Sequence, residues 1–527
     1  MSLTSRTWWL ARYLLKNLLA NLEVALVSSA GPYPVDPPFD PPEPYPEYPY
    51  SHFETPRTDT SNHVYRMVRE ALRLLALDDL HFGTPAWNPL GELITPGDRV
   101  LIKPNFVLHF NAGGGPLDAV VTHPSVIRAI VDYVVIALKR RGEILIGDAP
   151  QMNCDMARLF ELSGMDSLTE FLGAACLEQG IKLCAADFRV EQTFYKYGII
   201  WRRKSLDQRP SPIRVDLGEE SWMNGIDSQL LYGADYCRRA TVRAHSESRH
   251  EYLIAPDVLS SDVVISVPKL KVHRKVGVTL NLKNMVGINA DKNHLAHYRV
   301  GSPSTGGDEC SSPRWEDSFE RLLSDSLLGT DWRLGRYPFA AWRGFRKIWD
   351  RIRKNGPRRP FSFGNWHGND TAWRMALDLN RILLFADRQG RIGDQPARKY
   401  FSLIDGIVGG EGEGPLHPDA RVTGVLLAGF NPVAVDWTAT ALMGFNPALI
   451  PLYANAVKQV KQWLPDFQLD GIGVRTNSSV IDNVLDMREP VFRFRAPAGW
   501  HGKIECYSVE DEHATGRSTS VLDAVSQ

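Results

Sequence analysis

Cysteine is scarce in this chain, and the cysteines form no metal-binding motif. Among 527 residues there are six cysteines, and no two of them stand in a C-x-x-C pair. This spacing argues against a ferredoxin-type cluster or a zinc ribbon, so we expect no iron–sulfur cofactor. Scattered cysteines are typical of reduced thiols in a cytoplasmic protein.

An excess of charge of one sign is also missing. Lysine and arginine number 60 against 61 aspartate and glutamate residues, which leaves a formal net charge of −1. No overall field attracts nucleic acid, and we expect no nucleic-acid partner. Any binding driven by charge must come from a local patch.

The chain has no long uninterrupted apolar run. The most apolar stretch, Trp8–Leu26, fails as a spanning helix and as a signal peptide because polar and charged residues interrupt it. The interruptions are Arg12, Lys16, Asn17, Asn21 and Glu23. An amphipathic helix fits better, and it docks either on the rest of the domain or on the interface of a membrane.

Proline, in contrast, is concentrated in residues 31–56 together with tyrosine and phenylalanine. Such a run favours an extended polyproline strap or linker. It separates an N-terminal appendage from the body of the protein. The first body element is His63–Leu77, whose apolar residues have helical spacing.

The body alternates between strand and helix patterns. Arg99–Lys103 and Glu143–Asp148 are apolar runs typical of buried strands, and an apolar helix begins between them at Pro124. This order implies a right-handed parallel crossover. We predict an α/β fold of mostly parallel sheets with flanking helices, in two α/β lobes with a crevice between them. The predicted divisions are the appendage at 1–60, a first lobe at 61–300, an irregular insertion at 301–365, a second lobe at 366–507 and a disordered tail at 508–527.

Polar side chains follow the first two predicted strands. Lys103 and Asn105 end one strand, and Asp148 ends the next. In open α/β sheets, ligands bind outside the carboxyl ends of the strands. We therefore predict that Lys103 and Asn105 contact a ligand there.

The densest basic cluster lies in residues 266–288, after the buried strand Asp262–Val267. So many cations pack at a strand exit only if they face solvent, acids or an anionic ligand. We predict that Lys269 and Asn284 bind the ligand, and that Lys271 and Lys283 bind a carboxylate or phosphate or transfer a proton. His273 is the group in the cluster whose ordinary pKa lies near neutrality, so it is the candidate general acid or base, with a structural role as the alternative.

We predict a glycine-rich loop at residues 405–415, which carries Asp405, Glu411 and Glu413. Glycines permit a tight backbone path, so the acids could converge on a hard cation or on the basic cluster; a mobile loop with solvated acids is the alternative. We predict that Asp405 acts in catalysis and that a divalent metal is held by acids of this crevice. The metal candidates are Asp148, Glu411, Glu413 and Asp436.

Two further segments carry candidate contacts. Residues 366–374 precede a helix, and capping does not account for His367 or Arg374, which are candidate ligand contacts. Tyr337–Arg359 interleaves arginine with aromatic residues. It is either a solvated helix whose aromatics pack inward or a peripheral membrane patch.

Several motifs occur in an order that resembles the family called domain of unknown function 362. They are Val100–Asn105, Thr122–Pro124, Ile146–Asp148, Val267–His273, Val278–Gly287, Asp405–Ile407 and Asn431–Asp436. The resemblance covers roughly residues 98 to 445. Many members carry a cysteine-rich ferredoxin-like segment, and this chain departs from that pattern. The layout is also similar to that of nickel-pincer lactate racemases. This likeness is an analogy, and we do not infer a nickel cofactor from it.

The sequence therefore supports two hypotheses. The first is a cytoplasmic enzyme that carries out an isomerase- or racemase-like proton transfer on a small anionic or sugar-derived substrate, with or without the help of a metal. The second is a non-catalytic protein that binds an anion or glycan at the inner membrane surface. The sequence does not name the substrate, a cofactor or the oligomeric state.

Overall fold

The structure is a computed structural model of the chain. It describes residues 18–50, 58–196, 199–206, 210–234, 237–310, 315–327, 336–352, 362–458, 468–477 and 491–507. The predicted tail at 508–527 and most of the predicted N-terminal helix lie outside the described residues.

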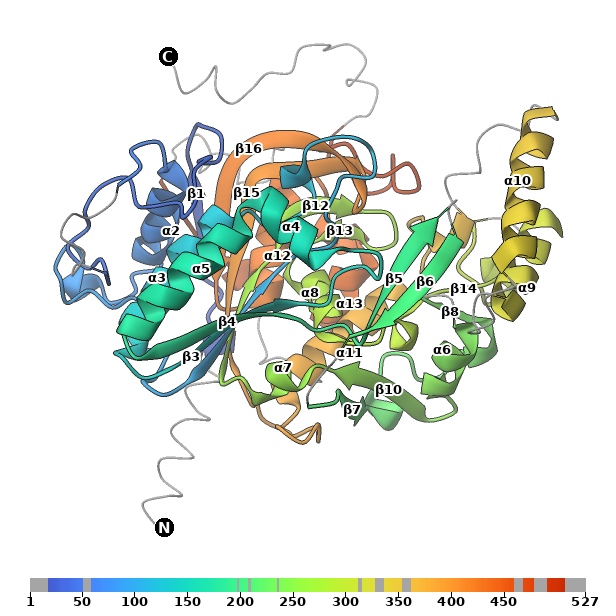
Figure 1. Ribbon diagram of the computed structural model, residues 1–527, viewed down its shortest axis with the longest axis horizontal. Helices are drawn as coiled ribbons and strands as arrows, with labels where there is room; N and C mark the ends of the chain where they lie inside the picture. The colour runs from blue at the N-terminus through green and yellow to red at the C-terminus, as the bar shows by residue number, and fades with distance from the viewer. Residues whose placement is uncertain are drawn as a thin grey trace.

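One mixed, mostly parallel sheet organises the described residues (Figure 1). Its strands run in the order β17-β1-β16-β15-β11-β2-β3-β4, and β12 and β13 extend it beside β15. Their bounds are β1 Val24–Ser28, β2 Arg99–Pro104, β3 Gly142–Asp148, β4 Ile181–Asp187, β11 Val263–Val267, β12 Lys269–His273, β13 Gly277–Thr279, β15 Lys399–Glu413, β16 His417–Gly429 and β17 Val474–Thr476. The predicted α/β class with flanking helices is confirmed.

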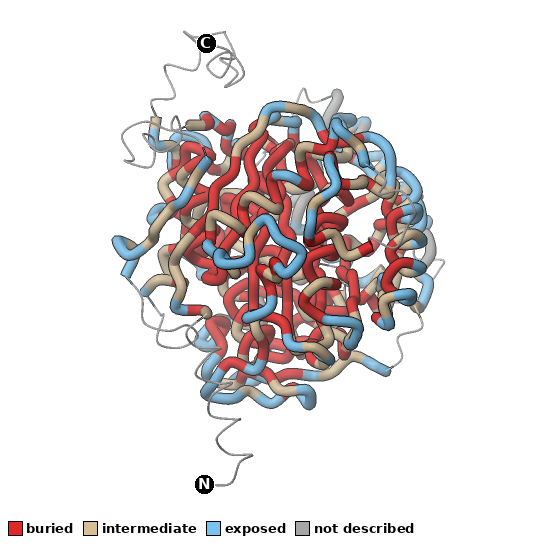
Figure 2. Tube along the Cα trace, turned by 90° about the vertical axis from the view of Figure 1, so that its left-hand side faces the viewer, coloured by how far each residue is buried: buried red, intermediate tan, exposed pale blue. Residues whose placement is uncertain are grey.

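Side chains alternate between two cores because successive residues of a strand point to opposite faces of the sheet. Val100 and Ile102 of β2 lie in one apolar cluster, and Leu101 lies in the other. Helices cover both faces, so the central strands are buried on both sides, as is typical of parallel sheets. Figure 2 shows the resulting continuous buried interior with exposed segments around it.

The helices form because apolar residues recur at helical spacing next to capping residues. Asn62 caps α2 by accepting from Tyr65 N, and Asn431 caps α12 by accepting from Val433 N and Ala434 N. The helix bounds are α2 His63–Leu74, α3 Pro124–Leu138, α4 Met156–Ser163, α5 Met165–Glu178, α6 Arg238–Ala244, α7 Pro256–Ser260, α8 Asn281–Asn284, α9 Trp315–Leu327, α10 Arg336–Ile352, α11 Ala372–Phe385, α12 Pro432–Leu442 and α13 Pro451–Lys458.

The two predicted lobes share this one sheet instead of having a sheet each. Parallel pairing joins β11 of the first lobe to β15 of the second, with Val263 opposite Lys399 and Ser266 opposite Ser402. A crevice between two separate sheets is therefore not what positions the site. The carboxyl ends of β2, β3 and β11 take that role.

The N-terminal segment belongs to the sheet as well. The end of the stretch predicted as an amphipathic helix forms β1, which pairs antiparallel with β16 and is buried from Val24 to Val27. Its run of valine, alanine and leucine suits a strand buried on both faces. The proline-rich strap then packs on the body, where Tyr33 and Phe39 are buried.

The glycine-rich segment predicted as a loop is part of the long strand β15. It pairs with β16 as far as Glu413 opposite His417. The glycines allow close packing, since a Cβ at Gly410 would lie 2.7 Å from the carbonyl oxygen of Ala119. The acids on this strand are therefore spread along a hairpin and do not converge.

The remaining elements lie to one side of the sheet, where Figure 1 shows α9 and α10 at the edge of the molecule. Three small sheets complete this part: β5 pairs with β6, β8 with β14, and β10 with β7 and β9. Their bounds are β5 Glu191–Lys196, β6 Ile199–Ser205, β7 Ile213–Asp216, β8 Leu231–Gly233, β9 His245–Ser246, β10 Arg249–Ile254 and β14 Ala296–Arg299.

Candidate functional site

A buried ion pair joins the carboxyl ends of β2 and β3. Lys103 Nζ lies 2.7 Å from Asp148 Oδ1, and both side chains are almost completely buried. The other carboxylate oxygen, Oδ2, accepts from Phe106 N at 2.7 Å. Burial lowers the pKa of Lys103, and the charge of Asp148 opposes that shift. The strand ends thus meet as the sequence predicts.

Asn284 connects this pair to the basic cluster. Its Nδ2 donates to Lys103 O at 3.0 Å, and its Oδ1 accepts from Lys103 Nζ and from Asn105 Nδ2, both at 3.2 Å. Gly287 makes the approach possible, because a Cβ there would lie 1.9 Å from Asp148 Oδ1. The segment after β13 is therefore fitted closely against the strand ends.

A cavity with a volume of about 90 Å³ opens beside this network. One water needs roughly 10–15 Å³, so the cavity has room for a small molecule. The polar residues that line it are Asn105, Asp148, Gln151, His273, Thr279, Lys283, Asn284, Lys292 and His297. Asn105 Oδ1 and Thr279 Oγ1 are buried and have no hydrogen-bond partner among the described residues. The lining thus offers polar groups that remain available to a ligand.

Two lysines give the cavity its positive charge. Lys292 Nζ donates to Ala149 O at 2.6 Å, whereas Lys283 Nζ makes no hydrogen bond or ion pair with any described residue. Burial lowers the pKa of each to about 7. The charge of Lys275 adds to the shift in the pKa of Lys283, while the charge of Asp148 opposes it for Lys292. Asp148 is the single carboxylate in the lining, and Lys103 already neutralises it. The cavity is therefore suited to an anion.

Two histidines line the same cavity with opposite hydrogen-bonding roles. His273 Nδ1 accepts from Lys275 N at 3.0 Å, so its neutral ring carries the proton on Nε2. His297 Nδ1 lies 2.9 Å from Leu295 O and must donate to it, which leaves a lone pair on Nε2. Burial first, and then the charge of Lys283, lowers both pKa values well below the ordinary value, so both rings are neutral. His273 thus offers a donor and His297 an acceptor.

A second buried cluster surrounds Asp405 and involves the proline-rich strap. Lys269 Nζ lies 3.0 Å from Asp405 Oδ2 and donates to Tyr33 Oη at 2.6 Å. Tyr33 donates to Asp405 Oδ1 at 2.5 Å, and its ring stacks on His123 with centroids 4.0 Å apart. Lys269 and Asp405 do not line the cavity. They neutralise each other, which explains how this lysine is buried.

The other two lysines of the basic cluster donate hydrogen bonds to backbone carbonyl groups. Lys271 Nζ donates to Val120 O, and Lys275 Nζ donates to Phe363 O. Burial lowers the pKa of both, to about 7 for Lys275. Neither residue lines the cavity, so the catalytic role predicted for Lys271 has no support from its position.

The predicted metal site is not assembled. Each candidate carboxylate has its own partner: Asp436 accepts from Asn281 N and Leu282 N, each at 2.9 Å, and Glu413 lies 2.7 Å from Arg274. Glu411 accepts from Arg495 N at 3.2 Å. Among the described residues, no three histidine, cysteine or carboxylate side chains are placed to hold a metal ion. The expected convergence of the acids depended on a loop at residues 405–415, and these residues form a strand instead.

The two candidate contacts next to α11 also lie away from the cavity. Both the Nδ1 and backbone N of His367 lie within hydrogen-bond distance of Gly499 O, at 3.2 and 3.0 Å. Arg374 donates to Trp222 O at 2.7 Å and pairs with Asp370 at 2.9 Å. Neither residue lines the cavity. His367 instead joins the loop before α11 to the loop at Gly499, and Arg374 on α11 holds the loop at Trp222.

Four polar residues of the cavity were not predicted, namely Gln151, Thr279, Lys292 and His297. Lys292 and His297 follow Gly287 in a segment without regular periodicity, and the sequence does not show that it folds back on Ala149. Their residue types alone could have suggested them, because Asn281–His297 continues the same basic segment. The sequence does not predict the contact of Tyr33 with Asp405, since nothing distinguishes Tyr33 from the other tyrosines of the proline-rich strap.

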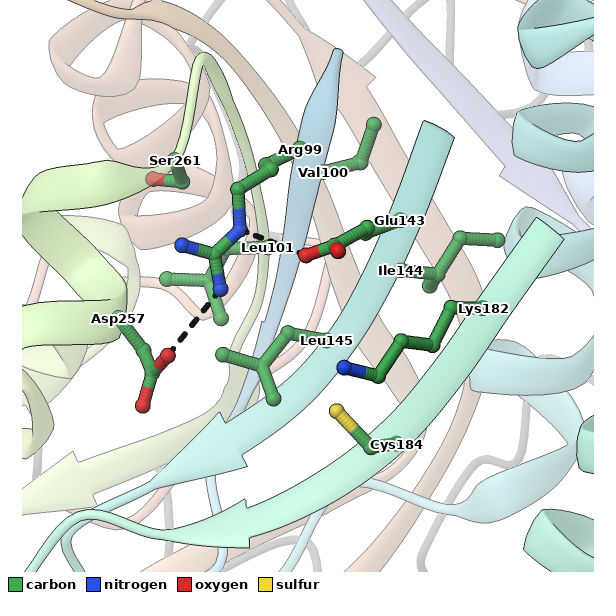
Figure 3. Close-up of a pocket in the computed structure, with 10 residues that line it drawn as sticks. All are labelled: Arg99, Val100, Leu101, Glu143, Ile144, Leu145, Lys182, Cys184, Asp257 and Ser261. Atoms are coloured by element: carbon green, nitrogen blue, oxygen red, sulfur yellow. Dashed lines mark hydrogen bonds and ion pairs between the residues drawn. The ribbon is translucent and has the colours of Figure 1, made fainter. Parts of the chain in front are cut away.

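A smaller hollow lies at the opposite end of β2, β3 and β4 (Figure 3). Its volume is about 10 Å³, roughly the space of one water. Arg99 spans it, 2.9 Å from Glu143 and 3.2 Å from Asp257. The arginine is therefore already neutralised by two acids, and this end of the sheet offers no comparable ligand site.

Comparison with known proteins gives a family and one curated relative. Residues 100–182 and 224–441 match the family described as domain of unknown function (DUF362). A thylakoid-associated protein of Synechocystis sp. is 22% identical over 368 residues, which are 69% of this chain and 69% of the relative. A crystal structure of a Thermotoga maritima protein matches 68% of this chain and 54% of its own length, at 10% identity and a TM-score of 0.26. This chain thus spans about half of that protein, and the likeness is too low to carry an argument.

Proposed function

This chain belongs to the DUF362 family, and we propose from its cavity that it is an enzyme that binds a small anionic or sugar-derived substrate and moves a proton within it. The observation that carries the proposal is Lys283: a buried amine that faces a cavity, with no acid to neutralise it. A buried cation without a partner is costly, and an anionic ligand removes that cost.

The surroundings of Lys283 support an anion over a metal. Lys292 and the Nε2–H group of His273 provide further donors, and Thr279 adds a hydroxyl without a partner. A carboxylate or phosphate accepts several such hydrogen bonds at once, and charge-assisted bonds of this kind are the stronger ones. The donor set contains too few oxygen ligands for a hard cation.

The same groups can move a proton near neutral pH. A lysine with a pKa of about 7 is present in both its neutral and its protonated form at that pH. His297 offers a lone pair that can accept a proton, and Lys283 in its protonated form can donate one, while His273 donates a hydrogen bond from Nε2–H. Isomerisation or racemisation needs one group to remove a proton and another to return it, and the cavity contains both kinds.

Sulfate binding should depend on pH through these lysines. Sulfate remains a dianion between pH 6 and pH 9, so changes in its affinity report on the protein. Affinity should be highest below pH 7 and fall above it, by up to about tenfold per pH unit for each lysine that must be protonated. Isothermal titration calorimetry of the wild type measures this dependence.

Matched lysine variants assign that dependence to the cavity. Lys283→Met should lose most of the affinity and flatten the pH profile, whereas Lys182→Met, at an exposed position on β4, should behave as wild type. Equal sulfate affinity at pH 6 and pH 9, or wild-type affinity in Lys283→Met, would remove the anion site from this cavity.

A second candidate function is binding at an anionic membrane surface, and the observation that favours it is the exposed face of α9 and α10. Leu322, Ile348 and Ile352 are exposed by 62%, 58% and 70%. Trp342, Phe345 and Trp349 lie along α10 with adjacent rings in contact. Aromatic and aliphatic residues beside basic ones suit the boundary of a lipid bilayer. No helix among the described residues is long and apolar enough to cross a membrane.

One basic residue of this segment does not belong to the candidate membrane face. Arg346 is 7% exposed, and its guanidinium lies 2.6 Å from Glu320 on α9. Reversing its charge would break the contact between the two helices. The exposed isoleucines are therefore the better positions for a test.

Vesicle co-sedimentation separates this candidate from the enzyme hypothesis. The double variant Ile348→Asn and Ile352→Asn should bind phosphatidylglycerol vesicles at least about tenfold more weakly than wild type, because each buried isoleucine contributes about 1.5–3 kcal/mol. Leu80→Asn is the control, since Leu80 is 95% exposed but lies outside α9 and α10. Wild type that stays in the supernatant, or a double variant that sediments as wild type does, would count against membrane binding.

A further inference from the structure

Lys283 differs from the other buried lysines of the site in its lack of a partner. Lys103 and Lys269 have carboxylates, and Lys292 has the carbonyl of Ala149. Lys271 donates to Val120 O. Among the described residues, no carboxylate or carbonyl accepts from Lys283 Nζ. Its amine is therefore available for chemistry that the others cannot perform.

The backbone on either side of Lys283 is held firmly. Asp436 accepts the N–H groups of Asn281 and Leu282, and Asn380 Nδ2 donates to Leu282 O at 2.7 Å. On the other side, Asn284 is bonded to Lys103 O. A reactive group needs a rigid support of this kind to be kept in a productive position.

We propose that Lys283 is a nucleophile that forms an imine with the carbonyl carbon of a small oxo acid. The inference rests on the proposed function and names its substrate class. Three features carry it: the amine has no partner, it faces a cavity, and the charges of Lys275 and Lys292 are nearby. Desolvation and neighbouring cations are the conditions that keep a lysine amine nucleophilic.

The step balances without an oxidant or a reductant. The lone pair of Lys283 Nζ attacks the carbonyl carbon, a C–N bond forms, and the C–O bond then breaks. The nitrogen loses one proton, which His297 accepts and passes to the oxygen, and solvent supplies the second proton, so the oxygen leaves as water. The Nε2–H group of His273 can donate a hydrogen bond to this oxygen. The nitrogen keeps its other hydrogen, and the product is a protonated imine.

The imine would also explain why a proton can move in this cavity. A protonated C=N bond withdraws electrons and makes hydrogen on the adjacent carbon acidic. The carboxylate of the oxo acid would lie against Lys292 and Thr279, two further donors of the lining. One lysine thus activates the substrate, and the other holds it.

Reductive trapping tests this inference. The full chain is incubated at pH 7 with pyruvate, a 2-oxo acid, and sodium cyanoborohydride, which reduces protonated imines, and digested peptides are analysed by mass spectrometry. We expect one carboxyethyl group on Lys283, formed at least about a hundredfold faster than on exposed Lys182, because the buried amine is far more often neutral. Sulfate should slow labelling of Lys283 and leave Lys182 unaffected.

The outcomes separate this inference from the proposed function. Lys283→Arg should lose the adduct, while Lys182→Arg should retain it. Equal labelling of both lysines, or labelling of Lys283 that sulfate does not slow in the wild type, would overturn the imine. If the wild type binds sulfate but gives no adduct at Lys283, the imine fails and the anion site stands. If the wild type neither binds sulfate nor forms the adduct, the proposed function fails, and the imine fails with it.

Discussion

Replacing Lys103 with methionine should lower the free energy of unfolding by about 3–5 kcal/mol, because it leaves the buried carboxylate of Asp148 without its cation. The two side chains are exposed by only 0% and 3%, so water cannot take the place of the lysine. Chemical denaturation monitored by circular dichroism measures the change.

Arg391→Met is a matched control for this effect. Arg391 and Asp387 also lie 2.7 Å apart, but their side chains are exposed by 77% and 38%. Loss of such a surface pair should change stability by less than about 1 kcal/mol. If both variants were destabilised to the same small extent, burial would not be what makes the Lys103–Asp148 pair important.

Replacing His297 with glutamine should slow proton exchange about a hundredfold or more, because it removes the lone pair that accepts the proton. Small hydroxy acids and oxo acids are incubated with the protein in deuterium oxide, and proton NMR follows loss of the hydrogen next to the carboxylate or the carbonyl. His297→Gln should still bind sulfate, since Lys283 and Lys292 remain.

The exposed histidine His81 provides the control, because its ring is distant in sequence and pairs with Asp78 outside the cavity. His81→Gln should exchange deuterium as wild type does. Proton transfer in the cavity would be contradicted if no acid of the panel exchanged in the wild type, or if His297→Gln exchanged at the wild-type rate.

The sequence predicts the centre of this site because local patterns determine it. Lys103 and Asp148 each follow a clear apolar strand, and the carboxyl ends of adjacent parallel strands must lie together. Lys283 belongs to a basic segment that directly follows another such strand. Their meeting is a consequence of strand order that a single sequence can indicate.

The rest of the site depends on contacts between distant segments. Tyr33 contacts Asp405, which lies 372 positions later in the chain. No pattern of apolar residues in the sequence predicts that contact. The glycines of residues 405–415 led to a wrong prediction of a loop where β15 continues. Glycine suits both a loop and a strand that packs closely on its neighbours. The tautomers of His273 and His297 depend on two backbone groups whose positions follow only from the fold.

A crystal soaked in selenate gives the most direct test of the central claim that the cavity is an anion site built around Lys283. Selenium scatters anomalously, so its position is found without reference to the protein. We predict a selenate ion inside the cavity with an oxygen within hydrogen-bond distance of Lys283 Nζ. Selenate found only at surface arginines and lysines, with none in the cavity at saturating concentration, would contradict the claim.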